Sequence, residues 1–315
     1  MTTPAPYFHD IAMGSAAAHA VWAQASDGVR LRIAIWPEVT APKPRGTILL
    51  LPGRTEFVEK YGLAAADLAA RGFATVAIDL RCQGASDRLL DNPLTGHVVR
   101  FDDYQMDVAA LLDVARAEGM PEPYYLLAHS MGGPIAFRAM VDGLPVKAAA
   151  LTAPMWGIKM APHLRPIAWG LCWAAQTFGF SHIFTPGTRK AAYVGIEPFE
   201  GNSLTSDPDM YAYMKAQLAA QPQFGLAGPS LQWLYASLKE LRRQAREPAP
   251  PIPTLTFLGT DEDVVQHPPI HRRMANWPMG RLDIIKGGRH EVLMETPAIR
   301  AEVFDKIAAH FAAYP

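Results

Sequence analysis

The sequence YYLLAHSMGG at Tyr124–Gly133 begins as a continuous apolar run, turns at a serine and continues into two glycines. An apolar run of this length, bounded by turn residues, predicts a strand that is buried on both faces of a parallel sheet. Apolar side chains at helical spacing follow over residues 132–141 and predict a helix. A buried strand that passes directly into a helix indicates an α/β domain.

The turn at Ser130 matches the G-x-S-x-G nucleophile elbow, with Ala128 in place of the first glycine. Small residues are needed two positions on either side of the serine because the sharp turn crowds the flanking backbone, and Ala128 adds only a methyl group. The turn raises the Oγ atom of Ser130 above the sheet. The alternative is an ordinary serine in a strand–helix turn, but the strand before it and the helix after it favour a nucleophile.

A serine nucleophile also needs N–H groups that bind a developing oxyanion. The N-terminus of the helix after Ser130 offers the N–H of Met131. A second donor is expected from an earlier loop, and Leu51-Pro52-Gly53-Arg54-Thr55 lies where this loop is needed. We therefore predict that the backbone N–H groups of Arg54 and Met131 form an oxyanion hole.

Strands and helices alternate on both sides of the elbow. Apolar runs predict strands over 47–51, 74–78, 124–128, 148–152, 254–258 and 281–285, and helical spacing predicts helices over 58–71, 102–118 and 132–141. Residues 29–35 alternate between apolar and polar side chains, which predicts a half-exposed antiparallel strand. A last helix is expected to begin at Pro297, with Thr296 as its N-cap. This order predicts an α/β fold with a doubly wound, mostly parallel sheet.

The alternation stops after Pro154 and resumes beyond residue 247. Residues 155–246 are rich in aromatic residues, methionine and glycine, and they show helical spacing but no clear buried strand. The proline-rich segment 247–253 then returns the chain to the sheet. We therefore expect a core of residues 1–154 and 247–315, interrupted by a helical cap of residues 155–246.

The base and the acid that would serve Ser130 are expected late in the chain, in the order serine, acid, histidine. Of the ten histidines, His290 lies in the loop after the last predicted strand and is the preferred base. The others fit less well: His310 is in the last helix, His267 and His271 flank prolines, and His129 is expected to point away from Ser130. The acid is expected after the strand at 254–258, where the residues alone do not distinguish Asp261, Glu262 and Asp263.

Composition excludes several classes of protein. The net charge is −1 and the pI is near 6.8, so nothing favours binding to nucleic acid. Cys82 and Cys172 are expected to be free thiols in a reducing compartment, and the first residues do not resemble a secretory signal, which favours a cytoplasmic protein. We expect no cofactor and no metal, because the phosphate-binding glycine motifs are missing and Met294 replaces the second histidine of H-E-x-x-H.

Several blocks taken together resemble the α/β-hydrolase superfamily, and within it the monoacylglycerol lipase and bacterial lysophospholipase branch. The blocks are the elbow, LPGRTEFVEKY at 51–61, DLRCQGAS at 79–86, GTDEDVV at 259–265, GRHE at 288–291 and, within the insertion, GPSLQW at 228–233. They span nearly the whole chain. The resemblance implies a serine hydrolase with a helical cap, which cleaves esters of the monoacylglycerol or lysophospholipid type through an acyl-enzyme.

The resemblance also implies which carboxylate is the acid. In the family motif the acid stands two places before the first of two β-branched residues, here Val264 and Val265, and this position is Glu262. The chain departs from the family at Pro52, which replaces a histidine, at Ala128, and at Glu262, where aspartate is commoner. The first departure bears on the oxyanion loop, whereas the longer acid still reaches His290 Nδ1.

Three other functions are left open by the sequence. They are a general short-chain carboxylesterase, a peptidase similar to proline aminopeptidases, and a binding protein that keeps the hydrolase fold without activity. Epoxide hydrolases and dehalogenases are disfavoured because their elbow carries an aspartate nucleophile.

The insertion carries side chains that suggest a substrate. Its large apolar residues form either an acyl-chain tunnel or membrane-facing lid, or ordinary packing against the sheet: Trp156, Trp169, Trp173, Phe178, Phe180, Ile183 and Phe184. Four basic residues either attract anionic lipid headgroups or form a solvated helix end: Lys239, Arg242, Arg243 and Arg246. The expected partner is therefore a small ester or lipid, with peripheral membrane contact through the cap as a further expectation. The sequence sets no oligomeric state.

Overall fold

The computed structural model describes residues 2–41 and 43–315. Its strands are β1 (Thr3–Ala5), β2 (His19–Gln24), β3 (Arg30–Trp36), β4 (Gly46–Leu51), β5 (Phe73–Asp79), β6 (Tyr124–His129), β7 (Ala149–Thr152), β8 (Thr254–Gly259) and β9 (Gly280–Ile285). Its α-helices are α1 (His9–Ala12), α2 (Gly62–Ala70), α3 (Tyr104–Ala117), α4 (Gly132–Val141), α5 (Leu164–Thr177), α6 (Tyr193–Ile196), α7 (Pro208–Ala220), α8 (Leu231–Gln244), α9 (His267–Ala275) and α10 (Pro297–Ala312). Short 3-10 turns lie at Val58–Tyr61, Phe101–Asp103, Pro222–Phe224 and Val292–Met294.

The strands form one sheet in the order β1-β2-β3-β5-β4-β6-β7-β8-β9. Neighbours from β5 to β9 are parallel, whereas β1, β2 and β3 pair antiparallel at one edge. The chain passes from β4 to β5 on one side and then crosses to β6 on the other, so the predicted doubly wound, mostly parallel sheet is confirmed. The carboxyl ends of β4 and β6 meet at this reversal, which is where open α/β sheets bind ligands.

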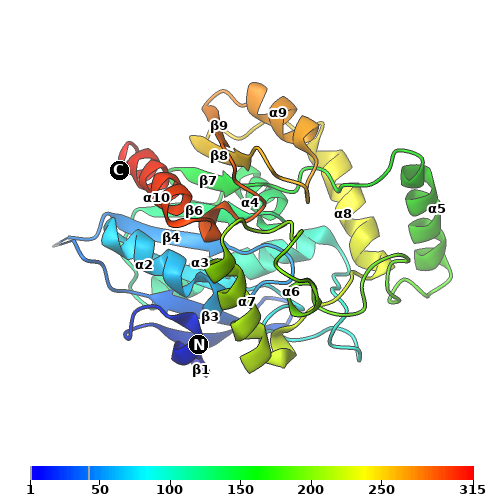
Figure 1. Cartoon of the computed structure of the whole chain (residues 1–315), viewed down its shortest axis with the longest axis horizontal. Helices are drawn as coiled ribbons and strands as arrows, with labels where there is room; N and C mark the ends of the chain where they lie inside the picture. Colours follow the sequence, from blue (N-terminus) through cyan, green and yellow to red (C-terminus); the bar gives the residue numbers. More distant parts are fainter. Residues whose placement is uncertain (1, 42) are drawn as a thin grey trace.

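Helices cover both faces of the sheet (Figure 1). Ile48 and Leu50 of β4 belong to the core on the side of α2 and α10, and Leu49 and Leu51 belong to the core on the side of α3 and α4. Burial of each such aliphatic side chain stabilises the fold by about 1.5–3 kcal/mol. This burial on both faces is the reason that the central strands have continuous apolar sequences.

The half-exposed character predicted for residues 29–35 is wrong. β3 is buried beyond its first residue, and the Arg32 guanidinium donates to Glu59 at 2.7 Å and to Asp79 at 2.8 Å. The alternation in sequence therefore reflects a buried ion pair and not a solvent-exposed face. The antiparallel pair of β1 and β2, which α1 separates in the chain, was not predicted. Thr296 is the N-cap residue of α10, as expected, but without a side-chain capping hydrogen bond.

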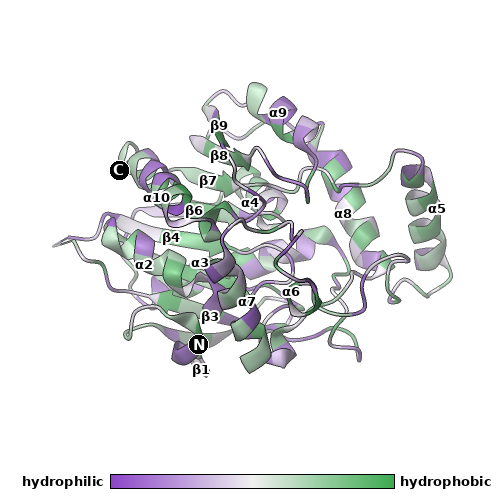
Figure 2. Cartoon of the chain, viewed as in Figure 1, coloured by the Kyte–Doolittle hydropathy of each residue, from purple (hydrophilic) through white to green (hydrophobic). Residues whose placement is uncertain are grey.

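Helices α5 to α8 lie between β7 and β8 in the chain. Figure 1 shows α5 at one edge of the molecule beside α8, and Figure 2 shows that α5 is hydrophobic along most of its length. Trp169 of α5 contacts Tyr235 of α8, with ring centroids 5.8 Å apart. Among the described helices, none combines the length and the hydropathy that crossing a membrane would require.

Candidate active site

Ser130 lies on the turn between β6 and α4, and its φ of 49° is in the left-handed region. Its N–H donates to the Thr152 carbonyl at 2.9 Å, and its own carbonyl accepts from the N–H groups of Gly133 and Met155 at 2.9 Å. These bonds hold a backbone conformation that costs a non-glycine residue about 1–3 kcal/mol. The turn is therefore rigid and fixes the position of the serine side chain.

The two glycines after Ser130 allow α4 to begin against the end of β4. A Cβ atom on Gly132 would lie 2.4 Å from the Leu51 carbonyl oxygen, and one on Gly133 would lie 2.4 Å from Pro154 Cβ. Ala128, which replaces the first glycine of the motif, is fully buried at the end of β6. The turn thus accepts a methyl group before the serine but none after it.

His290 lies between Ser130 and Glu262, in the loop after β9. Its Nε2 is 2.9 Å from Ser130 Oγ, and its Nδ1 is 2.6 Å from Glu262 Oε2. Asp261 accepts from the Thr260 hydroxyl, and Asp263 pairs with exposed Lys159. The structure therefore brings the expected serine, histidine and glutamate together and leaves the two neighbouring aspartates outside the hydrogen-bonded chain.

The hydrogen bonds of Glu262 determine its charge. Burial opposes ionisation, but His290 and the N–H groups of Val264 and Val265 outweigh this effect and hold the pKa of Glu262 below its usual value. The carboxylate is therefore ionised at neutral pH and accepts a hydrogen bond from the N–H of His290 Nδ1. This favours the tautomer in which Nε2 is free to accept the proton of Ser130.

The predicted oxyanion donors follow two strands that are neighbours in the sheet, since Arg54 follows β4 and Met131 follows β6. Neither backbone N–H has a hydrogen-bond partner within residues 2–41 and 43–315. The loop before Arg54 is held firmly: the Gly53 N–H donates to Glu56, and the Gly53 carbonyl accepts from Gln83 Nε2 at 3.0 Å. Pro52 therefore replaces the family's histidine without leaving this loop unsupported.

A buried cluster of charges, which the sequence analysis did not identify, lies next to His290. Lys60 Nζ donates to Glu56 and, at 2.7 Å, to Glu291 Oε1, while Glu291 Oε2 is 3.3 Å from His129 Nε2. Burial opposes the charged forms, yet the two glutamates raise the pKa of Lys60 and of His129. The Lys60 ammonium therefore offsets the charge of the two carboxylates inside the protein, with the His129 imidazole beside Glu291.

This cluster connects the loops that carry the site. Glu56 accepts from the oxyanion loop, and Glu291 directly follows His290, so Lys60 joins the two. Glu56, His129 and Glu291 also present the donor atoms of a metal site, but the Lys60 ammonium already supplies the positive charge there. The i, i+4 spacing of Glu56 and Lys60 was the signal in the sequence, although nothing in it linked the pair to Glu291.

We expect Lys60→Met to lower the free energy of unfolding by about 3–5 kcal/mol, because it leaves two buried carboxylates without their shared cation. The matched control is Lys306→Met, which removes a partly exposed pair with Glu302 and Asp283 and is expected to cost about 0–1 kcal/mol. Denaturant unfolding of both variants measures the difference. Equal stability of the two variants would show that the cluster is not held as described.

A cavity of about 380 Å³ contains Ser130 and His290 and extends beneath the insertion. Its apolar lining from the insertion comprises Met155, Ile158, Ala192, Tyr193, Val194, Leu204, Met214, Leu218, Leu226, Pro229 and Trp233.

None of the seven large apolar residues singled out in the insertion lines this cavity. Trp156 packs in the core near Trp277, with ring centroids 6.2 Å apart, while Trp173 and Phe178 are 58% and 73% exposed. An acyl tunnel formed by these residues is therefore wrong. Their spacing indicated helices but not the direction in which each side chain points.

Comparison with known protein families and relatives gives consistent matches. Residues 42–297 match the family model described as serine aminopeptidase, S33. The chain is 34% identical over 277 residues to lysophospholipase L2 of Escherichia coli (strain K12), which covers 84% of this chain and 79% of that protein. It is 25% identical over 189 residues to the monoacylglycerol lipase of Mycolicibacterium smegmatis, 60% of each chain.

Solved structures show the same architecture. A soluble variant of monoglyceride lipase from Saccharomyces cerevisiae superposes with a TM-score of 0.71 at 18% identity, covering 93% of this chain and 94% of that one. A thermostable carboxyl esterase from Bacillus coagulans superposes with a TM-score of 0.70 at 17% identity, covering 95% and 99%. The likeness establishes the α/β-hydrolase fold.

Proposed function

Because the chain belongs to the serine aminopeptidase S33 family of α/β-hydrolases, within which it is an ester-hydrolysing serine hydrolase, we propose that it releases fatty acids from lysophospholipids or monoacylglycerols. The observation that supports this most strongly is the hydrogen-bonded chain from Ser130 through His290 to Glu262, placed at an apolar cavity. The lining of this cavity is largely apolar, which suits the acyl chain of such a lipid.

In the proposed mechanism, Ser130 Oγ attacks the ester carbonyl while His290 Nε2 accepts its proton. The N–H groups of Arg54 and Met131 bind the oxyanion that forms, and Glu262 stabilises the imidazolium of His290. His290 then protonates the leaving glycerol oxygen, which leaves the acyl group on Ser130. Water, deprotonated by His290, attacks this acyl-enzyme and releases the fatty acid.

The acyl-chain preference tests the lipid proposal against a short-chain esterase. We expect the rate on p-nitrophenyl esters to rise from acetyl towards medium or long chains, because each buried methylene contributes about 0.8 kcal/mol of binding. Initial rates from acetyl to palmitoyl esters, measured beside Ser130→Ala, give this profile. A maximum at acetyl would identify a general carboxylesterase, and faster cleavage of prolyl amides would identify a peptidase.

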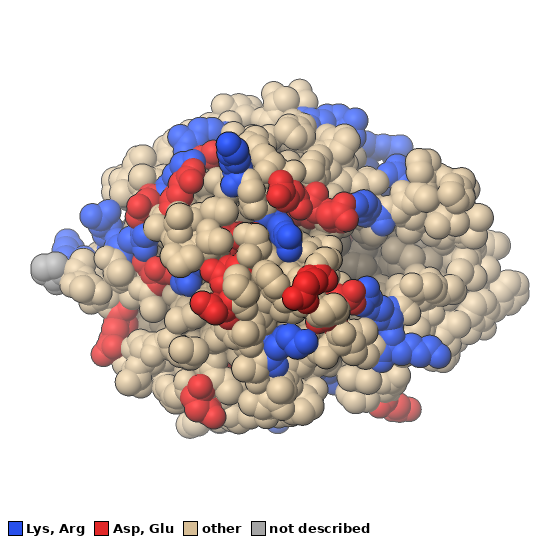
Figure 3. Space-filling model, in the orientation of Figure 1, with Lys and Arg blue, Asp and Glu red and all other residues tan. Residues whose placement is uncertain are grey.

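We also propose that the cap contacts membranes through α5. Leu164, Ile167, Trp173 and Phe178 of this region are 44%, 61%, 58% and 73% exposed. Figure 3 shows that the part of this face occupied by α5 carries few charged side chains. An exposed apolar helix face beside cations is typical of proteins that bind to the surface of a bilayer.

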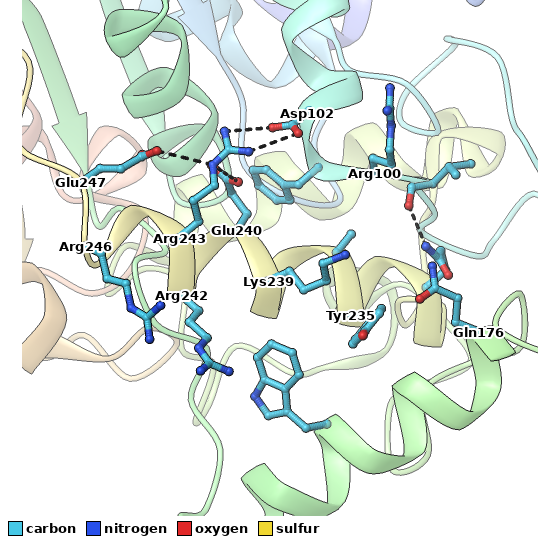
Figure 4. A pocket seen from close by; sticks show the side chains of 15 residues that line it. Arg100, Asp102, Gln176, Tyr235, Lys239, Glu240, Arg242, Arg243, Arg246 and Glu247 are labelled. Atoms are coloured by element: carbon cyan, nitrogen blue, oxygen red, sulfur yellow. Dashed lines mark hydrogen bonds and ion pairs between the residues drawn. The ribbon is translucent and has the colours of Figure 1, made fainter.

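The groove between α5 and α8 supplies those cations. It has a volume of about 750 Å³, and Figure 4 shows basic side chains of α8 within it. Arg243 is paired with Asp102, Glu240 and Glu247, with the Asp102 contact at 3.1 Å. In the described chain, Lys239, Arg242 and Arg246 have no carboxylate partner. These three residues therefore retain their charge for anionic headgroups.

The combined replacement of Lys239, Arg242 and Arg246 by glutamine is expected to weaken binding to anionic vesicles about 100-fold, since each cation near the surface contributes about 1 kcal/mol. Arg243→Gln is the matched control and should have a smaller effect, because its charge is already neutralised. Vesicle co-sedimentation measures both. Undiminished binding of the triple variant would exclude the headgroup contact.

A further inference from the structure

The Arg54 side chain lines the cavity of Ser130 and has no acidic partner among the described residues. Its Nη2 donates to the Ala227 carbonyl, while its Nε is buried and makes no hydrogen bond. Arg54 is half-buried, whereas three arginines that are buried each pair with two carboxylates or more: Arg32, Arg81 and Arg138. Among the described residues, Arg88 and Arg273 are half-buried like Arg54 and also donate to carbonyl oxygens without a carboxylate partner, but neither lines this cavity, so Arg54 is the unpaired arginine placed where a substrate enters.

An unpaired guanidinium that is largely removed from water lowers the stability of the fold. Burial lowers the pKa of Arg54 to about 10, so the side chain is still charged at neutral pH. A desolvated charge without a partner destabilises the fold unless a ligand supplies the opposite charge. The other cation that lines the cavity, Lys60, is already paired with Glu56 and Glu291. Of the described residues that line the cavity, Arg54 is therefore the free arginine or lysine that an entering anion can bind.

The surroundings of Arg54 hold its guanidinium in place. The Gly96 position is close enough that a Cβ atom there would lie 3.0 Å from Arg54 Nη2. The Gly96 backbone pairs with the start of the insertion's GPSLQW segment, through the Gly228 carbonyl at 3.2 Å and the Ser230 N–H at 2.8 Å. Trp233 of the same segment lies with its ring centroid 5.5 Å from Arg54 Cζ. The core and the insertion thus build this position jointly.

We propose that the Arg54 guanidinium binds the phosphate of a lysophospholipid substrate and so selects lysophospholipids over neutral monoacylglycerols. This rests on the function proposed above. The backbone N–H of the same residue is the proposed oxyanion donor. The ester carbonyl and the phosphate of one substrate would therefore be bound by the main chain and the side chain of Arg54. A glycerol backbone likewise separates the ester from the phosphate by a short distance. Guanidinium groups bind phosphate oxygens through paired, charge-assisted hydrogen bonds, whereas a neutral glycerol would leave the cation unpaired.

The test is the ratio of kcat/KM for a lysophospholipid to kcat/KM for a monoacylglycerol with the same short acyl chain, both below the concentration at which they aggregate. We expect Arg54→Met to lower this ratio about 10- to 100-fold, since a hydrogen bond to a charged group is lost, and Arg54→Lys to retain part of it. A ratio is used because it cancels any change in the shared chemical step. Arg116→Met, at an exposed arginine of α3, is the control and should leave the ratio unchanged.

A second measurement does not depend on the folding of the Arg54→Met variant. In wild-type protein, glycerol 3-phosphate should inhibit hydrolysis of p-nitrophenyl butyrate at concentrations at which glycerol does not. An unchanged ratio in Arg54→Met, or equal inhibition by glycerol and its phosphate, overturns the inference while the proposed function stands. If wild-type protein cleaves neither lipid, the proposed function fails and the inference fails with it.

Discussion

Ser130→Ala is expected to lower kcat/KM for ester substrates by at least ~10⁴-fold, because it removes the only atom that forms the acyl-enzyme in the proposed mechanism. Ser130 Oγ is 2.9 Å from His290 Nε2, so the proton acceptor is already in place. Binding and the oxyanion N–H groups remain in the variant, which is why a small residual rate over water is expected. Initial rates on a lysophospholipid and on a p-nitrophenyl ester measure the loss.

The control for this variant is its fold. The hydrogen bonds that hold the turn use the backbone of residue 130, so the melting temperature should change little. A fluorophosphonate probe should label the wild-type protein and not the variant. Substantial activity in a folded Ser130→Ala protein would mean that another residue is the nucleophile.

Glu262→Gln is expected to lower kcat by about 10³–10⁴-fold, the second largest effect that we predict. An amide in place of the carboxylate presents an N–H group to His290 Nδ1, which favours the tautomer that has its proton on Nε2. His290 Nε2, the ring nitrogen next to Ser130, then has no lone pair to accept the proton of the serine. The lowered pKa of Glu262 indicates that the wild-type carboxylate remains ionised well into the acidic range.

The neighbouring aspartates provide matched controls for this prediction. Asp261→Asn and Asp263→Asn change the same charge within one loop, but neither side chain contacts His290, and Asp263 is exposed and paired with Lys159. Each should retain activity within about twofold, since exposed ion pairs contribute little. A larger loss in either aspartate variant than in Glu262→Gln would reassign the acid.

The central sheet could be predicted because parallel strands that are buried on both faces have continuous apolar sequences. Such apolar sequences occur in β4, β5, β6, β7 and β8. The bounds of each predicted strand agree with the structure to within a residue or two. Ser130 and His290 could be predicted as nucleophile and base because a rigid elbow and a loop after the last strand are fixed places in such a fold. Glu262 was selected from three carboxylates only through the family resemblance.

The rest depends on contacts between residues far apart in the sequence. The alternating pattern around Arg32 indicates a solvent-exposed side chain, because nothing in the sequence shows that Glu59 and Asp79 pair with it. Lys60 and Glu291 are likewise joined only by the fold. The same limit applied to the aromatic residues of the insertion, because helical spacing does not determine whether Trp173 faces the cavity or solvent.

Detection of the covalent intermediate would show whether Ser130 is acylated during turnover. Wild-type protein is mixed with a long-chain p-nitrophenyl ester, quenched in acid during turnover and digested, and the peptide that contains Ser130 is examined by mass spectrometry. The expected result is that this peptide gains the mass of one acyl group at Ser130, and that Ser130→Ala shows no adduct. Steady hydrolysis with no adduct at Ser130, or with the acyl group on another residue, would contradict it.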